Sequence, residues 1–551
     1  MSFFEAMFGD DFPGTFTNGD GRSCKSKKTL LDLPAELMEL ICQHASNTDL
    51  KQLRLTNRQL AEQIELRVER VYISPNRANL DCLDKILSNP RHRLQVQYIV
   101  WDESELVSIP TLQEFCQILE RDAMTTKTAL EDHLRTIMRN ADDGSEDYEQ
   151  IKVENCVQED GRPNDIGKAI LLSANDRRSL DYIATSNVAK MSVEESYELY
   201  QKLYQDEKEI IKRGWDEAGL RRALTELPNL KRITITSEVW RPWNPIPVYN
   251  TPFYRALPAG FRKPSVVGPQ VRFGSYQYRQ TIERRVYRVI MSSLVTYPVS
   301  QLQEFIVDPG NEEMGLSHSL FSAPNVDYDN TMRMLSITPL KMLRLSFFDI
   351  SGMGQIGMPL LGDVVRAAPH LEHLDVQFRM RDDARIRYDE HYNPHRSPFQ
   401  DGLIERSCPD LKHFALRLAP VDSEWLFNLI TRSENLESVL LDKISLTMGF
   451  SGHEHLDAFF GRLKEYFRAA NRRGPSFTWI TQEFQAKGKK SRQLWLVLDD
   501  HLDAFLYDGG ESPFTGRNFG WGGLQDSKTG YKPGFGWIMN GRDPTFRKER
   551  E

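Results

Sequence analysis

The residues of this chain with the clearest catalytic pattern form a glycine-rich loop, Gly352-Met353-Gly354-Gln355-Ile356-Gly357. A GxGxxG loop between a strand and a helix can hold a dinucleotide pyrophosphate on backbone amides at the helix N-terminus. The run 343–348 predicts the strand, a helix is expected from Pro359, and Asp375 follows at the spacing of a ribose-binding acid. A nucleotide-binding oxidoreductase is therefore one alternative function. The same strand–loop–helix–strand succession recurs elsewhere without glycines, so a glycine-rich loop within a repeat is the preferred interpretation.

Histidine and cysteine side chains are the other candidates for chemistry. His391 and His395 stand four residues apart, but an Asn-Pro pair between them disfavours the helix that would align them. The group His453-Glu454-His455 and the pair Cys408 and His413 have no further partners in the sequence pattern, so loop histidines and a buried thiol are the simpler interpretations. We therefore predict no catalytic residues, no metal, no cofactor and no enzymatic activity.

Composition narrows the class of protein. The chain has 551 residues, enough for two to four domains or one long repeat array. Its residues are 40% hydrophobic, which supports a large core, and its net charge of −8 mixes both signs. A nucleic-acid or anionic-membrane binder would normally carry a basic surplus, so we expect neither partner. The scattered cysteines, the lack of a signal-peptide pattern and the lack of a long apolar run favour a cytoplasmic or nuclear protein.

The stretch from Leu30 to Arg58 predicts two amphipathic helices near the N-terminus. The first begins at Pro34, and its expected face comprises Leu37, Leu40, Ile41, His44 and Ala45. The second is expected to be capped by Asp49 with Gln52, and its face comprises Leu50, Leu53, Asn57, Leu60, Ala61, Ile64 and Val68. Two such short helices cannot bury their faces well against each other alone. They need the rest of the chain, a partner, or both.

The segment Leu33-Pro34-Ala35-Glu36-Leu37, followed by Ile41 and the pattern DLxxLRLxNR from Asp49, resembles the F-box over roughly residues 29–75. In that family the motif binds a Skp-type adaptor of a cullin–RING ubiquitin ligase. The resemblance implies the same partner here. The residues implied to contact the adaptor, or to support the helices that do, are Leu33, Pro34, Leu37, Ile41, Leu50, Leu53 and Leu55.

An internal repeat organises much of the remaining chain. The pattern apolar-x-x-apolar-x-apolar occurs as Leu230-Ile233-Ile235, Leu302-Phe305-Val307, Leu340-Leu343-Leu345, Leu371-Leu374-Val376, Leu411-Phe414-Leu416 and Leu436-Val439-Leu441. Most copies follow a helix-like stretch, and such βα units bury a core only by stacking on neighbours. The pattern resembles degenerate leucine-rich repeats, and with the F-box it resembles a large group of fungal F-box proteins. The expected fold is an α+β or α/β solenoid, with F-box helices followed by an irregular leucine-rich-repeat-like βα array.

The predicted organisation has five parts. They are a flexible N-terminus (1–28), the F-box-like motif (29–75), a linker of strands and helices (76–216), the repeat domain (217–507) and a tail rich in glycine and aromatic residues (508–551). Residues 141–165 hold nine Asp or Glu against two Lys or Arg, which indicates a solvated mobile loop. Two β-like runs after residue 475 predict a hairpin with a lysine-rich tip at 487–490. The tail is expected to lie on the repeat domain or to meet a partner.

These patterns favour the substrate-recognition subunit of an SCF-type cullin–RING ubiquitin ligase. The F-box would bind the Skp-type adaptor, and the repeat domain would bind a protein substrate that the sequence does not identify. One alternative is a leucine-rich-repeat scaffold whose N-terminal helices cap the array, in which case residues 29–75 expose no apolar stripe. The other is the nucleotide-binding oxidoreductase that would use Gly352 to Gly357.

Overall fold

The chain divides into two compact units, residues 1–68 and residues 69–551, which we call the N-terminal unit and the sheet unit. The computed structural model describes residues 30, 33–140, 152–158, 162–173, 183, 190–236, 249, 251–262, 264, 285–308, 315–317, 320–348, 358, 360–379, 410–417, 419–442, 444–448, 452–453, 456–487, 490–514 and 537–540. The predicted flexible segment 1–28 lies outside these residues. So do the glycine-rich loop 352–357, His391, His395 and Cys408.

The N-terminal unit contains three short helices, α2 (Ala35–His44), α3 (Asn47–Thr56) and α4 (Arg58–Gln63). The predicted cap of the second helix is displaced by three residues. Ser46 is the N-cap, and Asp49 occupies the third helical position of the capping box. The predicted second helix is also two helices, because Asn57 leaves helical geometry and its side chain caps α4 by accepting the N–H of Gln59.

One face of these helices forms a small core. It consists of Met38, Ala45, Leu50, Leu60 and Ile64. The backbone after α4 is tied to the turn between α2 and α3 by Asn47 and Arg67, since each donates to the other: Asn47 Nδ2 to the Arg67 carbonyl at 2.9 Å and the Arg67 N–H to Asn47 Oδ1 at 3.0 Å. The Arg67 side chain also donates to the carbonyls of Gln43 and Ala45. These bonds hold the three helices in a defined arrangement.

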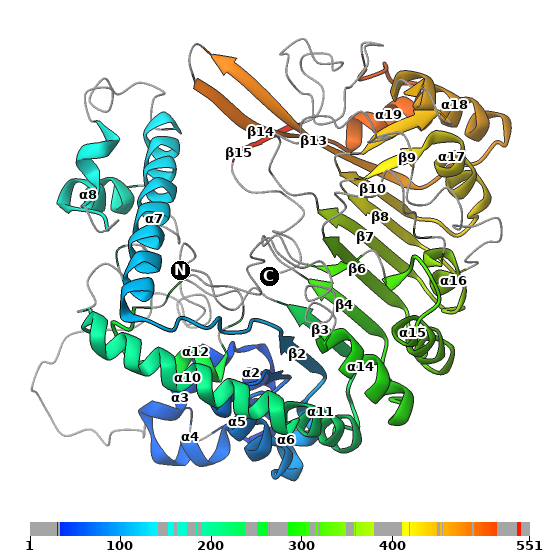
Figure 1. Cartoon of the computed structure of the whole chain (residues 1–551). Helices are drawn as coiled ribbons and strands as arrows, with labels where there is room; N and C mark the ends of the chain where they lie inside the picture. Colours follow the sequence, from blue (N-terminus) through cyan, green and yellow to red (C-terminus); the bar gives the residue numbers. More distant parts are fainter. Residues whose placement is uncertain are drawn as a thin grey trace, which may run out of the picture. The chain divides into compact units, whose positions relative to one another are not determined.

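The sheet unit is built on a twelve-stranded sheet among the described residues, with mostly parallel strands (Figure 1). Its path follows chain order through β1 (Arg70–Ile73), β2 (Tyr98–Asp102), β3 (Arg232–Thr236), β4 (Glu304–Asp308), β6 (Met342–Phe348), β7 (His373–Arg379), β8 (His413–Arg417), β10 (Ser438–Asp442), β13 (Ser476–Lys487), β14 (Lys490–Leu498) and β15 (Trp537–Asn540). The short strand β5 (Leu316–Ser317) pairs with β6. A mixed α/β fold with an open, mostly parallel sheet confirms the α/β part of the predicted class.

The apolar repeat explains why the strands stack in this order. All residues of the six predicted triplets are buried. Their last two members stand directly opposite one another in successive strands, as Ile233 opposite Phe305 and Leu374 opposite Phe414. Each strand therefore contributes two side chains to a continuous row in the core.

The same pattern extends further toward the N-terminus than the predicted repeat domain. Ile99 and Trp101 of β2 are buried and stand opposite Ile233 and Ile235 of β3, and β1 pairs with β2 in parallel. The predicted boundary at residue 217 therefore does not separate a linker from the sheet. The interval of more than 100 residues between β2 and β3 concealed the periodicity, although Val96-Ile99-Trp101 has the same spacing as the six triplets.

A backbone hydrogen-bond ladder accompanies the repeat at the entrance to the strands. The carbonyl of Gln97 accepts the amides of Lys231 and Arg232, and the carbonyl of Lys231 accepts those of Gln303 and Glu304. The arrangement continues through the carbonyls of Gln303, Lys341, Glu372 and Lys412. Each unit thus satisfies two donors of the next before its strand begins, which stabilises the parallel stacking.

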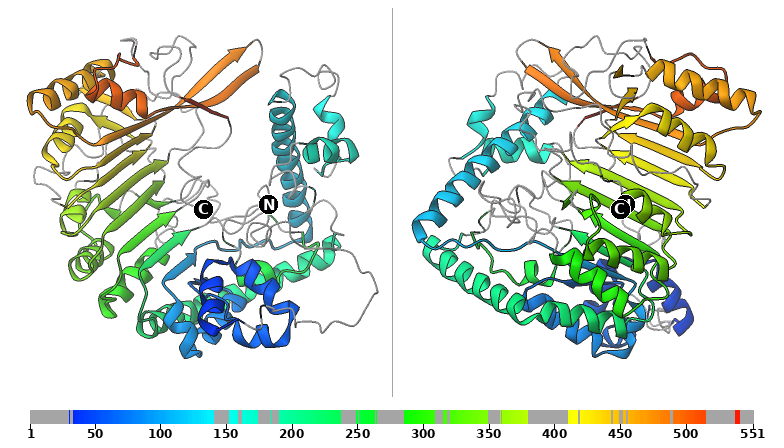
Figure 2. Two further views of the ribbon diagram at one scale, coloured as in Figure 1. Left: turned by 180° about the vertical axis from the view of Figure 1, so that it is seen from behind. Right: turned by 45° about the vertical axis from the view of Figure 1, so that its right-hand side comes forward.

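The connecting helices cover one face of the sheet (Figures 1 and 2). They are α5 (Arg77–Leu87), α6 (Pro90–Gln95), α11 (Trp215–Glu226), α14 (Arg285–Thr296), α15 (Val326–Ile337), α16 (Leu361–Arg366), α17 (Ser423–Arg432) and α18 (Leu456–Ala469). Tyr287 of α14 packs edge-on against Phe305, and Trp425 of α17 against Phe414, so these helices lie over the buried apolar row. The alternate residues of each strand point to the opposite face.

Three further helices flank β3 in the chain. Helices α7 (Leu112–Asn140) and α10 (Val193–Arg213) precede it, whereas α12 (Pro252–Ala256) follows it and packs beside α5. The helix α10 begins with a capping box of Ser192 and Glu195 and ends at Gly214, whose φ of 65° suits a residue without Cβ. Among the helices that the structure describes, none has both the length and the apolar character needed to cross a bilayer.

The acidic segment 141–165 is more ordered than predicted in its described part. Residues 153–156 form the 3-10 helix η3, and Val153, Cys156 and Val157 are buried in a cluster with α7 and α8 (Asp165–Ser173). The prediction of a solvated loop relied on the high acidic content of the segment and overlooked these three apolar side chains. Their spacing brings them to one side of the turn. Burial of that side offsets the cost of ordering the segment.

The C-terminal elements agree with their predictions. Strands β13 and β14 form an antiparallel hairpin in which Lys487 stands opposite Lys490. Strand β15, within the aromatic tail, pairs with β14, so this part of the tail lies on the sheet unit. The remaining elements are α19 (Asp500–Tyr507) and a small sheet of β9 (Pro420–Asp422), β11 (Ser445–Met448) and β12 (Gly452–His453).

We predict that Phe305→Ala lowers the free energy of unfolding of the sheet unit by about 3–5 kcal/mol, because it removes a fully buried ring and leaves a cavity. Chemical denaturation followed by circular dichroism measures the change. Val326→Ala is the control, since this side chain is 71% exposed and should change stability by less than about 0.5 kcal/mol. Equal effects of the two substitutions would contradict the proposed stacking core.

Candidate functional site

Exposed leucines distinguish the surface of the N-terminal unit. Leu37 and Leu40 on α2 are 48% and 51% exposed, and Leu55 on α3 is 81% exposed. Leu37 and Leu40 stand three residues apart and therefore share a face of α2. The core of the unit is formed by other residues, so these leucines contribute little to its internal packing.

The seven residues implied by the F-box resemblance occupy different environments. Leu50 is buried in the core, and Leu33 and Leu53 pack against that core while partly buried. Ile41 is half-buried, whereas Pro34, Leu37 and Leu55 are exposed. The buried members are placed to support the helices, and the exposed members are placed to contact another molecule.

The predicted apolar face of α2 is divided between the core, which Ala45 enters, and the surface. Met38, Cys42 and Ala45 point toward the core, whereas Leu37 and Leu40 point away from it. Both sets have helical spacing, so periodicity alone did not distinguish them. Leu40 is therefore a further candidate contact residue that the family resemblance did not include.

The sheet unit has a polar face opposite its helices. One row of this face runs across neighbouring strands and consists of Tyr98, Arg232, Glu304, Met342, His373 and His413. All six side chains are half-buried. Arg232 lies over the ring of Tyr98 at 4.9 Å and pairs with Glu304, and the rings of His373 and His413 are 5.6 Å apart. This row combines aromatic and charged groups that can contact a ligand.

A buried ion-pair network lies deeper on the same face. Asp375 of β7 accepts hydrogen bonds from Arg417 of β8 at 3.0 and 3.1 Å and from Arg344 of β6 at 2.9 Å. Burial by itself would raise the pKa of Asp375, but Arg417 and Arg344 outweigh it and hold that pKa well below its ordinary value. The resulting stability is present above the ordinary aspartate pKa of about 4 and is lost as the pH falls below it.

This network bears on the nucleotide-binding alternative. The carboxylate of Asp375, the acid at ribose-binding spacing in the sequence, is occupied by two guanidinium groups. His413 donates to or accepts from the hydroxyl of Ser438 at 2.8 Å. The glycine-rich loop and Cys408 lie outside the described residues, as does the side chain of His453. No group of three or more potential metal ligands occurs within the part of the chain that the structure describes.

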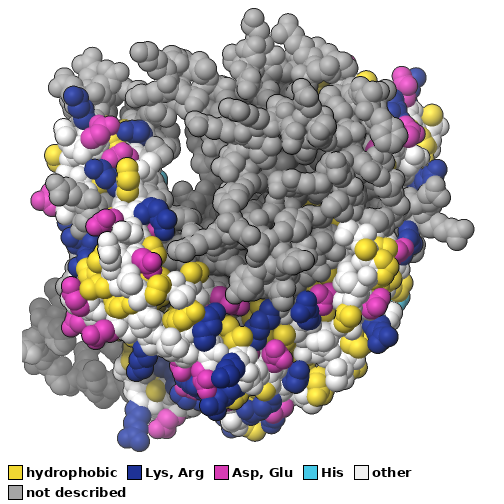
Figure 3. All heavy atoms as spheres, viewed as in Figure 1, with side chains coloured by type: hydrophobic (Ala, Val, Ile, Leu, Met, Phe, Trp, Pro, Cys, Tyr) yellow, Lys and Arg dark blue, Asp and Glu magenta, His cyan; other side chains and the backbone are white. Residues whose placement is uncertain are grey.

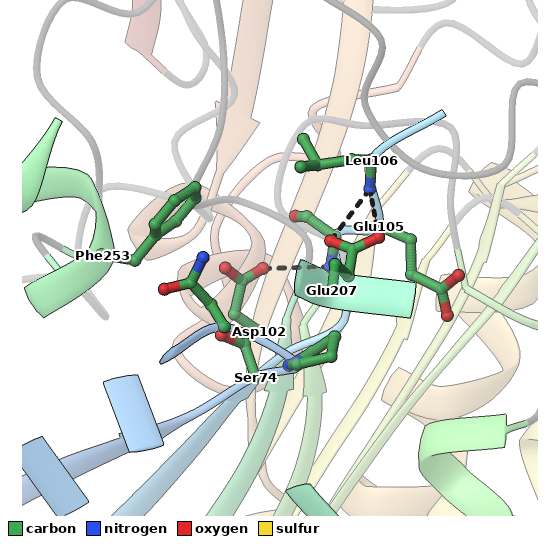
Figure 4. A pocket seen from close by; sticks show the side chains of 9 residues that line it. Ser74, Asp102, Glu105, Leu106, Glu207 and Phe253 are labelled. Carbon is green, nitrogen blue, oxygen red and sulfur yellow. Dashed lines mark hydrogen bonds between the residues drawn. The ribbon is translucent and has the colours of Figure 1, made fainter. Parts of the chain in front are cut away.

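A small acidic cavity of about 20 Å³ lies at the end of β2 (Figure 4). It is lined by Ser74, Pro75, Asn76, Asp102, Ser104, Glu105, Leu106, Glu207 and Phe253. Glu207 accepts the N–H of Leu106 with both carboxylate oxygens, at 2.9 and 3.1 Å, and Asp102 accepts the N–H of Ser104 at 3.0 Å. Burial raises the pKa of Asp102 to about 7 and raises that of Glu207 well above its ordinary value. Sequence inspection did not identify this cluster, because Asp102 and Glu105 lie about 100 residues before Glu207 in the chain.

The rest of the visible surface carries mixed charge. In the described part of the face drawn in Figure 3, Lys and Arg side chains alternate with Asp and Glu.

No protein-family model matches the chain, and no curated protein is found to be similar to it. The functional argument therefore rests on the chain's own residues and their geometry.

We predict that Asp375→Asn destabilises the sheet unit by about 3–5 kcal/mol, because it leaves two largely buried guanidinium groups without their anion. Denaturant titration at neutral pH measures the loss. Glu372→Gln is the matched control on the preceding turn, where Glu372 pairs with the more exposed Lys341 and Lys412, and it should have little effect. A small effect of Asp375→Asn would show that the network contributes little to folding.

Proposed function

We propose that the chain is the substrate-recognition subunit of an SCF-type cullin–RING ubiquitin ligase. The N-terminal unit binds a Skp-type adaptor, and the sheet unit binds a protein substrate. The chain itself performs no chemistry in this proposal. The observation that carries it is the exposure of Leu37, Leu40 and Leu55 on a small helical unit whose core is already complete without them.

The energetic argument concerns water-exposed apolar area. Burying a leucine side chain contributes about 1.5–3 kcal/mol, so leucines left in water represent binding free energy available to a partner. The capping box of α3 and the hydrogen bonds between Asn47 and Arg67 already hold the helices in place. Because the unit need not become ordered on binding, the entropic cost of association is lower. The resemblance of segment 33–37 to the F-box motif supports a Skp-type adaptor as that partner.

The sheet unit supports the second half of the proposal. Its successive βα units, parallel strands in chain order and apolar triplets agree with an irregular leucine-rich-repeat solenoid. In such an array the face opposite the helices contacts ligands. We propose the half-buried row from Tyr98 to His413 as the substrate-contact surface, because its aromatic and charged side chains suit protein recognition.

The mechanism is an increase in effective concentration. A substrate held by the sheet unit, while the N-terminal unit holds the adaptor, stays near the ubiquitin carrier of the ligase. The target lysine then meets the carrier far more often than it would by free diffusion. The proposal locates the protein where cullin–RING ligases work, in the cytoplasm or the nucleus.

The exposed leucines also separate this proposal from the scaffold alternative. Helices that merely cap the array would bury their apolar residues internally and expose no apolar stripe. Leu37 and Leu40 are about half exposed, which favours a docking surface. The oxidoreductase alternative gains no support, since Asp375 is committed to Arg344 and Arg417.

We predict that the double variant Leu37→Ser with Leu40→Ser weakens adaptor binding by about tenfold or more, because apolar area worth about 1–3 kcal/mol is lost from the interface. The measurement is isothermal titration of the full chain with a purified Skp-type adaptor. The unfolding midpoint should stay close to that of the parent chain, since both side chains are substantially exposed.

Leu94→Ser is the matched control for this experiment. Leu94 belongs to α6 of the sheet unit and is 60% exposed, so its substitution removes a similar exposed leucine outside the proposed surface. Adaptor affinity should then remain unchanged. If the parent chain binds no adaptor, or if the double variant binds as tightly as Leu94→Ser, the ligase proposal is wrong.

A further inference from the structure

Residues 103–111 form an extended segment, which we call the strap, between β2 and the start of α7 at Leu112. The strap has no strand partners along most of its length within the described residues, yet much of its backbone is hydrogen-bonded. The partners are side chains of α10. Glu207 accepts the N–H of Leu106, Tyr200 bonds both the N–H and the carbonyl of Val107 at 3.1 and 2.7 Å, and further donors follow toward α7.

The further donors complete the attachment. Gln201 Nε2 donates to the carbonyl of Ile109 at 2.6 Å, and the Tyr197 hydroxyl donates to that of Pro110 at 2.9 Å. Tyr197, Tyr200 and Gln201 lie within about one turn of α10, and Glu207 lies seven positions after Tyr200, so these residues line one face of the helix. Leu106 and Ile109 of the strap are buried in a cluster with Phe115, Tyr200 and Phe253. Closure of the strap on α10 thereby fixes how α7 begins.

At the end of the strap nearest β2, acidic side chains outnumber basic ones. Asp102 and Glu207 are both buried, and they line one cavity together with Glu105 (Figure 4). Lys208 is the ammonium group beside them, 3.4 Å from Glu105 and 3.8 Å from Glu207. Two buried carboxylates that share a small cavity cannot both ionise without a large electrostatic cost.

Among the described residues, the other groups around the cavity do not balance this negative charge. From α5 and the turn before it come Ser74, Asn76 and Asn79, which are neutral, and Asn79 is engaged with Ser74 and with the N–H of Phe253. Arg77 pairs with Asp206 at 3.4 Å. Further titratable or charged residues of α10 and α12 include Tyr200, Tyr204, Tyr254 and Arg255.

We propose that this cavity is a proton-operated latch for the strap. With one proton held by Asp102 or Glu207, the strap is closed on α10. Loss of that proton leaves two buried anions beside Glu105, and the repulsion releases the strap at Leu106 and Val107. The device would couple solution pH to the attachment of α7, independently of any adaptor or substrate.

The direction of the effect follows from proton linkage. Burial raises the pKa of Asp102 to about 7, above the ordinary aspartate value of about 4. The closed state therefore binds the proton more tightly than an open, solvated state. The proton's contribution to closure is therefore complete below about pH 4, and it is lost progressively as the pH rises from about 4 to about 7.

Amide hydrogen exchange of the full chain tests the latch. Protection factors of Leu106 and Val107, corrected for the intrinsic pH dependence of exchange, should fall by up to about tenfold per pH unit between about pH 4 and about pH 7. The amides of Ile99 and Val100 in β2 serve as internal references for global unfolding and should keep their protection.

Asp102→Asn is the decisive variant, because asparagine can still accept the N–H of Ser104 but carries no charge. It should make the protection of the strap less dependent on pH than in the parent chain across the same range, because one of the two buried carboxyl groups no longer titrates. Glu207→Gln retains an acceptor for the N–H of Leu106 and should likewise flatten the pH dependence. This variant replaces Asp102→Asn if Asp102→Asn does not fold.

Glu209→Gln is the control, since Glu209 lies on the same helix and pairs with Arg213 away from the cavity. The latch proposal is wrong if the protection of Leu106 and Val107 in the parent chain does not depend on pH. It is also wrong if both neutral variants keep the pH dependence of the parent chain.

Discussion

Parallel strands of the sheet unit depend on one another through two buried side chains per strand. Ile233, Phe305, Leu343, Leu374 and Phe414 lie in one continuous row, each directly opposite the next. No single βα unit can bury these groups alone, so the free energy of folding lies mainly in the interfaces between units. The backbone ladder at the strand entrances adds a second constraint, since every unit accepts amides from the next. The polar face can vary because this apolar row holds the strands in place.

The buried carboxyl groups of the sheet unit are stabilised in two different ways. Asp375 stays ionised because Arg344 and Arg417 surround it with positive charge. Asp102 and Glu207 have no equivalent pair of cations among the described residues, and burial raises their pKa values. The first arrangement is rigid over the neutral pH range, whereas the second responds to it. Asp102 and Glu207 adjoin the strap, which is held to α10 by side-chain hydrogen bonds. A change in their charge can therefore alter how the strap is attached.

The N-terminal unit and the sheet unit differ in how they use leucine. In the sheet unit the leucines of the repeat are buried and stabilise the fold. In the N-terminal unit Leu50 does the same, but Leu37, Leu40 and Leu55 face solvent. A small unit cannot cover all of its apolar side chains, and those left exposed become a surface for association. This division of roles is the physical basis of the proposed adaptor contact.

Elements whose signal is local can be predicted from the order of the residues alone. Triplets such as Leu371-Leu374-Val376 specified buried strands, and the runs around Lys487 and Lys490 specified a hairpin, because side-chain alternation and turn position are short-range properties. Tertiary structure decided what depends on distant partners. It joined β2 to β3 across the long interval between them, turned Met38 rather than Leu37 toward the core, and brought Asp102 beside Glu207. Local spacing cannot select among faces with equal periodicity, and it cannot place residues from different elements in one cavity, because only the packing of the whole unit sets those distances.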